Sequence, residues 1–177
     1  EEINRILTDA ISDWLFVTEK SGIDNLRNEG VAAEKVHLVG NVMIDTLLSC
    51  RDRAESSTIL EVLGVKGGGY GVLTLHRPAN VDDPATFGRL MGAVNRLAEH
   101  LPIVFPVHPR TRKSLAAAGS TPGVLLTEPL GYLDFMKLTA HARLVLTDSG
   151  GIQEETTVLG VPCLTLRLNT ERPITCE

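Results

Sequence analysis

Residues 144–155 read LVLTDSGGIQEE, and this stretch decides how the chain folds. The apolar or β-branched residues Leu144–Thr147 are typical of a buried strand. The SGG turn that follows leads directly into a helix, which is expected at Ile152–Leu159. A strand that passes through a short turn into a helix is the repeating unit of a parallel sheet. The stretch therefore predicts an α/β fold.

The same alternation of strand and helix extends over the second half of the chain. Strands are expected at 70–75, 103–107, 124–127, 144–147 and 162–166, with helices at 84–99, 112–118, 133–142 and 152–159 between them. This pattern predicts a doubly wound parallel sheet of Rossmann-like type, with helices on both faces. The commonest strand order, 3-2-1-4-5, places the first strand beside the fourth. The loops 76–82 and 148–151 should then meet where ligands bind.

The first part of the chain is expected to be a separate region. Helices are expected at 1–12, 20–29 and 42–54, with strands at 14–17 and 35–39. Both ends of the chain look cut, because the first helix follows no strand and the last strand is followed by no covering helix. We therefore interpret 1–54 as the remnant of a preceding domain with a connecting segment, 55–69 as a linker, and 70–177 as a Rossmann-like binding domain without its final helix.

Composition and charge exclude several classes of protein. The formal net charge is -5, so neither nucleic acid nor an anionic membrane, which both need a basic face, is the expected partner. The three cysteines form no disulfide framework and no metal-ligand spacing. No apolar run approaches about 18 residues, the length that a transmembrane helix needs. We expect a cytoplasmic protein without a metal.

The SGG turn carries the clearest chemistry. Backbone N–H groups at the start of a helix bind anions, and Gly150 and Gly151 let a phosphate approach closely. Ser149 adds a hydroxyl donor or caps the helix, and Glu155, about one turn later, is placed to accept hydrogen bonds from a ribose diol. The alternative is an ordinary capped helix. The chain lacks GxxxxGKS/T, the phosphate-binding loop of many ATP-binding proteins. Its glycine run, Gly67–Gly71, comes before a strand, whereas the glycine motif of NAD-binding proteins follows one. A nucleotide sugar is therefore favoured over ATP or NAD.

Other candidate residues follow the first two strands of the predicted sheet. TLHRPAN at 74–80 places His76, a candidate general acid or base, and Arg77, a partner for an anion, at the end of the first strand. FPVHPRTRK at 105–113 places His108 in a basic cluster after the second strand. The alternatives are a structural hydrogen bond for the histidine of the first strand and a solvated loop for the cluster.

Two further residues are candidates by position. Phe135, in GYLDF, opens the helix before the SGG strand and is placed to stack on a base, the alternative being a buried core residue. Arg172, in TERP near the end of the chain, is placed to reach a diphosphate or base, the alternative being a surface arginine. Both candidates would add nucleotide contacts to those of the SGG turn.

Together these segments resemble the UDP-N-acetylglucosamine 2-epimerase family. The matching stretches are EEINR at 1–5, GNVMIDTLL at 40–48, LHRPAN at 75–80, FPVHPRTR at 105–112, EPLGYLDF at 128–135, LTDSGGIQEE at 146–155, GVPCLTLR at 160–167 and NTERP at 169–173. The similarity spans nearly the whole chain. Two positions depart from the family pattern: Ala79 lies in a loop that is often HRREN, and Ala10 stands where histidine is frequent.

The resemblance implies a two-domain glycosyltransferase-B-like fold, of which this chain supplies the half that binds UDP. The residues that it assigns to the nucleotide are Ser149, Gly150 and Gly151 for the diphosphate, Glu155 for the ribose, Phe135 for the uracil and Arg172 nearby. His76 corresponds to the family's catalytic-site histidine, and Glu1 to an active-site glutamate. Arg77 and His108 match positions that contact a second, activating UDP-sugar in bacterial non-hydrolysing members.

The resemblance also implies the reaction, a non-hydrolysing interconversion of UDP-GlcNAc and UDP-ManNAc. UDP is eliminated across C1–C2 to give 2-acetamidoglucal and is added back after protonation of the other face. The family implies no cofactor, a homodimeric full-length enzyme and a place in cell-envelope polysaccharide biosynthesis. The alternatives are a hydrolysing relative and a glycosyltransferase of the same fold, since architecture does not fix chemistry. The chain by itself is expected only to bind UDP.

Overall fold

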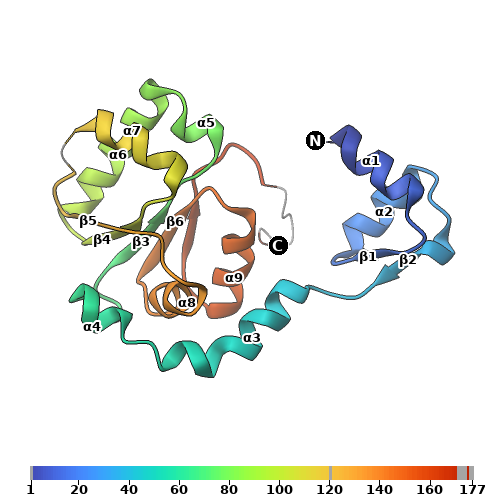
Figure 1. The fold of residues 1–177 in the computed structure, drawn as a ribbon, viewed down its shortest axis with the longest axis horizontal. Coiled ribbons are helices and arrows are strands. Elements are labelled where there is room, and N and C mark those ends of the chain that lie inside the picture. The colour runs from blue at the N-terminus through green and yellow to red at the C-terminus, as the bar shows by residue number, and fades with distance from the viewer. Residues whose placement is uncertain (1, 120, 171–174, 176–177) are drawn as a thin grey trace. The chain divides into compact units, whose positions relative to one another are not determined.

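The computed structural model describes residues 2–119, 121–170 and 175, and divides the chain into two compact units, Glu1–Thr46 and Leu47–Glu177 (Figure 1). The first unit contains α1 (Glu2–Ile11), β1 (Leu15–Val17), α2 (Lys20–Asn28), a 3-10 turn at Ala33–Lys35 and β2 (Val36–Leu38). Its two strands pair in parallel. Its small core consists of Leu15, Val17 and Leu26. Leu15 and Val17 point to the same side of β1, because side chains alternate along a strand, and Leu26 is the buried residue of α2.

The second unit is built on a five-stranded parallel sheet. Its strands are β3 (Gly71–Thr74), β4 (Ile103–Pro106), β5 (Val124–Thr127), β6 (Leu144–Thr147) and β7 (Cys163–Thr165). They lie in the order β5-β4-β3-β6-β7, which confirms the predicted order 3-2-1-4-5. The central pair is in register from Gly71 opposite Leu144 to Thr74 opposite Thr147, so β3 and β6 end side by side.

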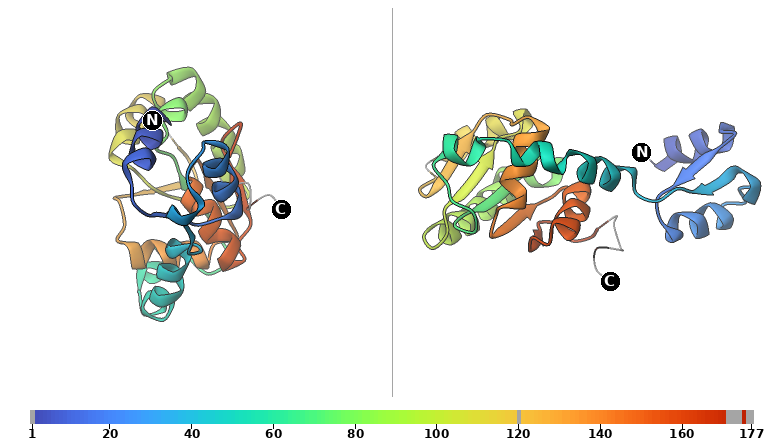
Figure 2. Two further views of the ribbon diagram at one scale, coloured as in Figure 1. Left: turned by 90° about the vertical axis from the view of Figure 1, so that its right-hand side faces the viewer. Right: turned by 90° about the horizontal axis from the view of Figure 1, so that it is seen from below.

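Helices cover both faces of this sheet, whose strands β3, β4 and β6 are mostly buried. They are α4 (Ile59–Leu63), α5 (Pro78–Val81), α6 (Pro84–Ala98), α7 (Pro109–Ala118), α8 (Tyr132–Ala140) and α9 (Gly150–Leu159). The helix α3 (Val42–Glu55) begins before the division between the units, and its Leu47 and Ala54 pack with Met136 of α8. Figures 1 and 2 show α5, α6 and α7 on one side of the sheet and α4, α8 and α9 on the other. Alternate residues of β3 serve the two sides: Leu73 packs into the first core and Val72 into the second.

Residues 55–69 differ from the predicted linker. The division between the units falls between Thr46 and Leu47, and 55–69 belongs to the second unit. Within it, α4 buries Ile59 against the core beneath α8, and Val65 packs on the same core. The sequence predicts a linker here because most residues of the segment are polar or glycine. Most of its apolar side chains pack on the core that contains Leu138 of α8.

Several helices also differ from the predictions. The short helices α4 and α5 were not predicted, α7 begins at Pro109 instead of Arg112, α8 begins at Tyr132 instead of Leu133, and α9 begins at Gly150 instead of Ile152. Both α5 and α7 start on a proline, whose fixed φ suits the first helical position and whose missing N–H has no partner there in any case. Within the part of the chain that the structure describes, no helix has the length and apolar character needed to cross a bilayer.

Tyr70, at the start of β3, ties the sheet to α8. Its side chain is fully buried, and its hydroxyl donates a 2.6 Å hydrogen bond to the carbonyl of Leu138 in the last turn of α8. The last four carbonyls of a helix have no partner within it, so this bond satisfies a group that would otherwise be buried without one. The helix that carries Phe135 is thereby fixed against the sheet.

We predict that Tyr70→Phe lowers the free energy of unfolding by about 1–3 kcal/mol, because it leaves the Leu138 carbonyl without this donor. Urea unfolding followed by circular dichroism would measure the change. Tyr132→Phe is the matched control, since Tyr132 is 42% exposed and its loss should have little effect. Equal stability of Tyr70→Phe and the wild type would contradict the role assigned to this bond.

Candidate functional site

A cavity of about 300 Å³ lies where the strands β3, β4 and β6 end. The residues that line it come from the ends of β3 and β4, the loops after β3, β4, β5 and β6, and the first turns of α8 and α9. Four of the predicted site residues are among them: His76, His108, Phe135 and Ser149. The strand order accounts for this meeting, because it puts the carboxyl ends of β3 and β6 next to each other at the switch point.

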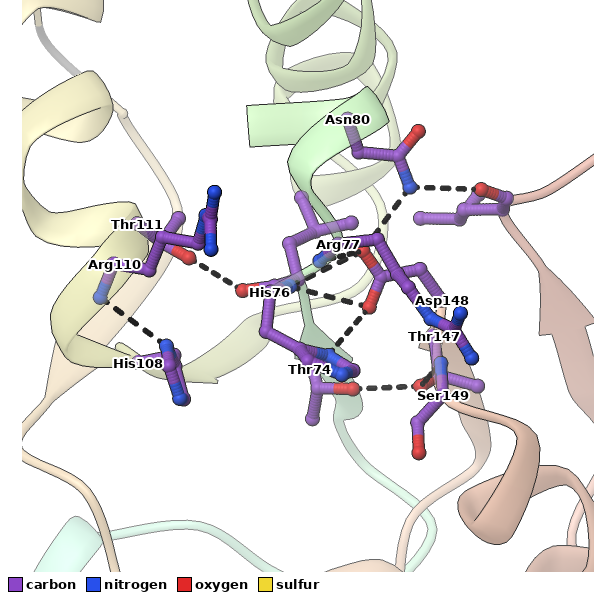
Figure 3. A network of polar contacts seen from close by, with 12 residues as sticks. Thr74, His76, Arg77, Asn80, His108, Arg110, Thr111, Thr147, Asp148 and Ser149 are labelled. Atoms are coloured by element: carbon purple, nitrogen blue, oxygen red, sulfur yellow. Dashed lines mark hydrogen bonds and ion pairs between the residues drawn. The ribbon is translucent and has the colours of Figure 1, made fainter. Parts of the chain in front are cut away.

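Asp148 organises one wall of this site, although the sequence analysis did not name it as a site residue (Figure 3). Its side chain is fully buried. Its carboxylate accepts the backbone N–H of Arg77 at 2.9 Å and the side-chain amide of Asn80 at 3.1 Å. It also accepts the backbone N–H of His76 and lies 2.9 Å from the Nδ1 atom of that ring. The signal in the sequence was an acidic residue directly after a buried strand, where a charge needs partners.

The donors around Asp148 keep its carboxylate charged. Burial raises the pKa of this group, but the hydrogen bonds from the His76 ring, the Arg77 backbone and the Asn80 side chain act against burial, and together they leave the pKa below its ordinary value. Buried charges are tolerated when they are hydrogen-bonded in this way. The loop after β3 therefore folds around a fixed negative charge.

The two predicted histidines lie next to each other. The rings of His76 and His108 have centroids 5.8 Å apart and are tilted by 51°. The side chain of His76 is 40% exposed, so part of the ring is open to the cavity although Nδ1 faces Asp148. His108 precedes α7 as its N-cap, and its Nδ1 atom accepts the backbone N–H of Arg110 at 3.1 Å. Thr111, also in α7, donates to the carbonyl of Leu75 and fixes this helix to the end of β3.

The SGG turn forms the opposite wall. Ser149 is the N-cap of α9, yet among the described residues its side chain makes no capping hydrogen bond. The backbone N–H of Ser149 donates to the Thr147 hydroxyl at 3.0 Å, and that hydroxyl is also bonded to Thr74. The first N–H groups of a helix have no partner within it. Of the three residues of the turn, Ser149 lines the cavity, whereas Gly150 is buried and neither glycine is among the lining residues. The N–H groups of Gly150 and Gly151 belong to the first turn of α9, where the helix itself supplies no acceptor.

Phe135 and Glu155 lie close to this wall in different ways. Phe135 packs on the core beneath α8, as the alternative in the sequence analysis had it, and also lines the cavity. Its stacking on a base stays a prediction. Glu155 is buried in α9 and is not among the residues that line the cavity. Burial, and next the nearby charge of Glu154, raise the pKa of Glu155. Hydrogen-bond donors on a ligand would stabilise the charged form of such a buried carboxylate.

The remaining candidates are not gathered in the cavity. The side chain of Arg77 lines a neighbouring cavity of about 650 Å³ together with Arg89 and Arg167, although its backbone is bound to Asp148. The predicted basic cluster is partly neutralised, because Arg110 forms a two-bonded ion pair with Asp82 and Arg112 pairs with Glu128 at 2.5 Å.

Two predicted residues, Glu1 and Arg172, lie outside the residues that the structure describes. Of the cysteines, Cys50 and Cys163 are free, and Cys176 also lies outside. Among residues 2–119, 121–170 and 175, no group of three histidine, cysteine or acidic side chains is placed to hold a metal ion. The described residues at the site supply hydroxyl and N–H donors, two imidazoles and the buried carboxylate of Asp148.

Comparisons with known proteins agree with this picture. The sequence model of a family described as UDP-N-acetylglucosamine 2-epimerase matches residues 1–177. The crystal structure of the Methanocaldococcus jannaschii UDP-GlcNAc 2-epimerase in complex with UDP-GlcNAc and UDP superposes with a TM-score of 0.87 at 40% identity, covering 99% of this chain and 51% of that one. The Neisseria meningitidis UDP-GlcNAc 2-epimerase bound to UDP-GlcNAc gives 0.86 at 33% identity, with 99% and 50% covered.

A relative with a different named substrate is also similar. The UDP-2,3-diacetamido-2,3-dideoxy-D-glucuronate 2-epimerase of Pseudomonas aeruginosa is 43% identical over 97% of this chain and 48% of its own length. The chain thus spans about half the length of the relatives that it matches.

The raised pKa of Glu155 gives a prediction for stability. A carboxyl group whose pKa is higher in the folded chain stabilises the fold only while it is protonated, and this contribution disappears as the pH rises through the raised pKa. We therefore expect Glu155→Gln to raise the free energy of unfolding at pH 7. The difference from the wild type should shrink as the pH falls below about 4, near the ordinary carboxyl pKa.

Urea unfolding at both pH values tests this expectation. Glu61→Gln serves as the control, because Glu61 is exposed on α4 and its replacement should change little. A loss of stability at pH 7 in Glu155→Gln would show that this carboxylate is held by donors in the unliganded chain.

Proposed function

The chain belongs to the UDP-N-acetylglucosamine 2-epimerase family, and on this basis we propose that it is the UDP-binding part of an enzyme that interconverts UDP-GlcNAc and UDP-ManNAc. The proposal rests on one observation: four of the predicted site residues line the same cavity at the start of α9, namely His76, His108, Phe135 and Ser149. In this proposal the α/β unit is one half of a glycosyltransferase-B-like fold, and the remaining cleft wall comes from the rest of the enzyme.

The nucleotide would bind at the SGG turn. The diphosphate accepts hydrogen bonds from the N–H groups of Gly150 and Gly151 and from the Ser149 hydroxyl, with the positive end of the α9 dipole behind them. Phe135 offers a ring face to the uracil. Glu155 accepts hydrogen bonds from the ribose diol, and these donors offset the cost of its burial.

The same donors suit the reaction. A base removes the proton from C2 of the sugar, the bond between C1 and the UDP oxygen breaks, and a C1–C2 double bond forms. Negative charge develops on the departing UDP, where the N-terminus of α9 stabilises it. Proton delivery to the other face of C2 and return of UDP to C1 complete the inversion. We assign His76 to proton transfer at this site. Glu1 keeps the role that the resemblance implies, that of an active-site glutamate of the complete enzyme.

Two further assignments belong to this proposal. Arg77 and His108 would contact a second, activating UDP-sugar, which then has to reach two cavities, because the Arg77 side chain and the His108 ring line different ones. The complete enzyme would be a cytoplasmic homodimer that supplies cell-envelope polysaccharide synthesis and needs no cofactor.

A specific observation favours a second substrate for the same reaction. The relative from Pseudomonas aeruginosa is named for a diacetamido uronic acid. Proton NMR of the complete enzyme with UDP-GlcNAc distinguishes the possibilities. Appearance of UDP-ManNAc supports the proposal, whereas release of free ManNAc and UDP indicates a hydrolysing enzyme. Turnover of only the diacetamido uronate sugar would identify the second substrate, and transfer of the sugar to an acceptor would identify a glycosyltransferase.

We predict that the 177-residue chain binds UDP weakly and does not epimerise UDP-GlcNAc. Ser149→Tyr should abolish UDP binding, because the larger side chain fills the space that the diphosphate needs. Ser56→Tyr, at an exposed position after α3, is the control and should bind UDP as the wild type does. Calorimetric titration of UDP into each variant measures the affinities. Epimerisation by the chain alone would place the whole catalytic set within it.

Loss of one charge-assisted contact should also weaken binding. We expect Arg172→Ala to cost about 1.5–3 kcal/mol, which corresponds to about a ten- to hundredfold lower affinity for UDP. The same titration measures this change. An unchanged affinity in both Ser149→Tyr and Arg172→Ala would mean that UDP binds elsewhere.

A further inference from the structure

Asp148 constrains where His76 can carry its proton. One carboxylate oxygen of Asp148 accepts the Arg77 N–H at 2.9 Å and the Asn80 amide at 3.1 Å. The other lies 2.9 Å from Nδ1 of His76. An ionised carboxylate only accepts hydrogen bonds, so Nδ1 must be the nitrogen that carries the proton. In the neutral ring the second nitrogen, Nε2, is then an acceptor.

His108 is constrained in the opposite sense. Its Nδ1 atom accepts the backbone N–H of Arg110 at 3.1 Å, so Nδ1 is unprotonated. The neutral ring then carries its proton on Nε2 and is a donor there. The two rings lie 5.8 Å apart and line the same cavity. A proton acceptor and a proton donor are therefore held side by side.

We propose that Asp148 is a positioning residue that fixes His76 with its proton on Nδ1, so that the cavity holds an acceptor on His76 beside a donor on His108. This inference rests on the proposed function for the nature of the sugar group that meets them. The pair suits a neutral group that both gives and accepts a proton, such as a hydroxyl or acetamido group of the sugar. The anionic diphosphate is matched instead by the N–H groups at the start of α9.

The environment of Asp148 predicts how an amide would behave in its place. In Asp148→Asn the amide oxygen is expected to take the position that faces Arg77 and Asn80, which both donate. The amide nitrogen then faces Nδ1 of His76 and donates to it. The proton of His76 moves to Nε2, and the acceptor that faced the cavity is lost. A carboxylate-to-amide change behind a histidine is known to exchange its tautomer in this way.

Nitrogen-15 NMR of the histidine-labelled chain, without ligand, measures both tautomers. The spectra are recorded in mildly alkaline buffer, and the signals of the two ring nitrogens show which of them carries the proton. For the wild type we expect His76 protonated on Nδ1 and His108 on Nε2. For Asp148→Asn we expect the His76 proton on Nε2, with His108 unchanged. Asp83→Asn is the matched control, because asparagine caps α6 as well as aspartate does, and it should leave both rings unchanged.

Each result decides between the assignments. A wild-type His76 protonated on Nε2, or a His108 protonated on Nδ1, overturns the proposed pair. Retention of the Nδ1 proton in folded Asp148→Asn overturns the positioning role. If that variant does not fold, the wild-type spectrum still tests the assignment of His76. A free histidine prefers the proton on Nε2, so a proton on Nδ1 of His76 requires a partner such as Asp148. Since no nucleotide is present, failure of this proposal leaves UDP binding by the chain untouched, and failure to bind UDP leaves the tautomers untouched.

Discussion

The structure of the site depends on one buried negative charge. Asp148 directly follows β6, which lies between β3 and β7, and its side chain is fully buried, so water cannot solvate the carboxylate. A charge in that place needs hydrogen-bond donors, and the loop after β3 supplies them from its backbone and from Asn80. Because Asn80 also donates to the carbonyl of Leu166, the end of β7 is drawn into the same network. The positions of His76 and the start of α5 follow from this requirement.

Much of the second unit could be predicted from the sequence, because its apolar strands and capped helices are local patterns. The strand order then brought His76, His108, Phe135 and Ser149 to one cavity, as the topology of such sheets requires. The segment at 55–69 could not be predicted, since its polar residues hide the contact that Ile59 makes with distant strands. Asp148 was missed for the same reason: its partners are about seventy residues away in the chain, and only the fold reveals that it is buried.

The site divides its tasks between two walls of different chemistry. The wall at α9 offers N–H and hydroxyl donors, of which the Ser149 backbone group is already occupied by Thr147. The wall at β3 and β4 offers two imidazoles whose hydrogen bonds to Asp148 and to the Arg110 backbone set their orientation. An anion is thus expected at the first wall and a neutral, proton-exchanging group at the second. A sugar joined to a diphosphate has these two parts in one molecule.

The side-chain amide of Asn80 makes two hydrogen bonds, and these limit which residues of this loop can be replaced. Asn80 joins the buried carboxylate to the end of β7, so a replacement there breaks two connections at once. Its neighbours Pro78 and Ala79 are exposed, and their side chains carry no hydrogen-bonding group. Mutational tolerance therefore changes from one residue to the next within a single turn of helix. A change at position 79 leaves the network whole, whereas a change at Asn80 does not.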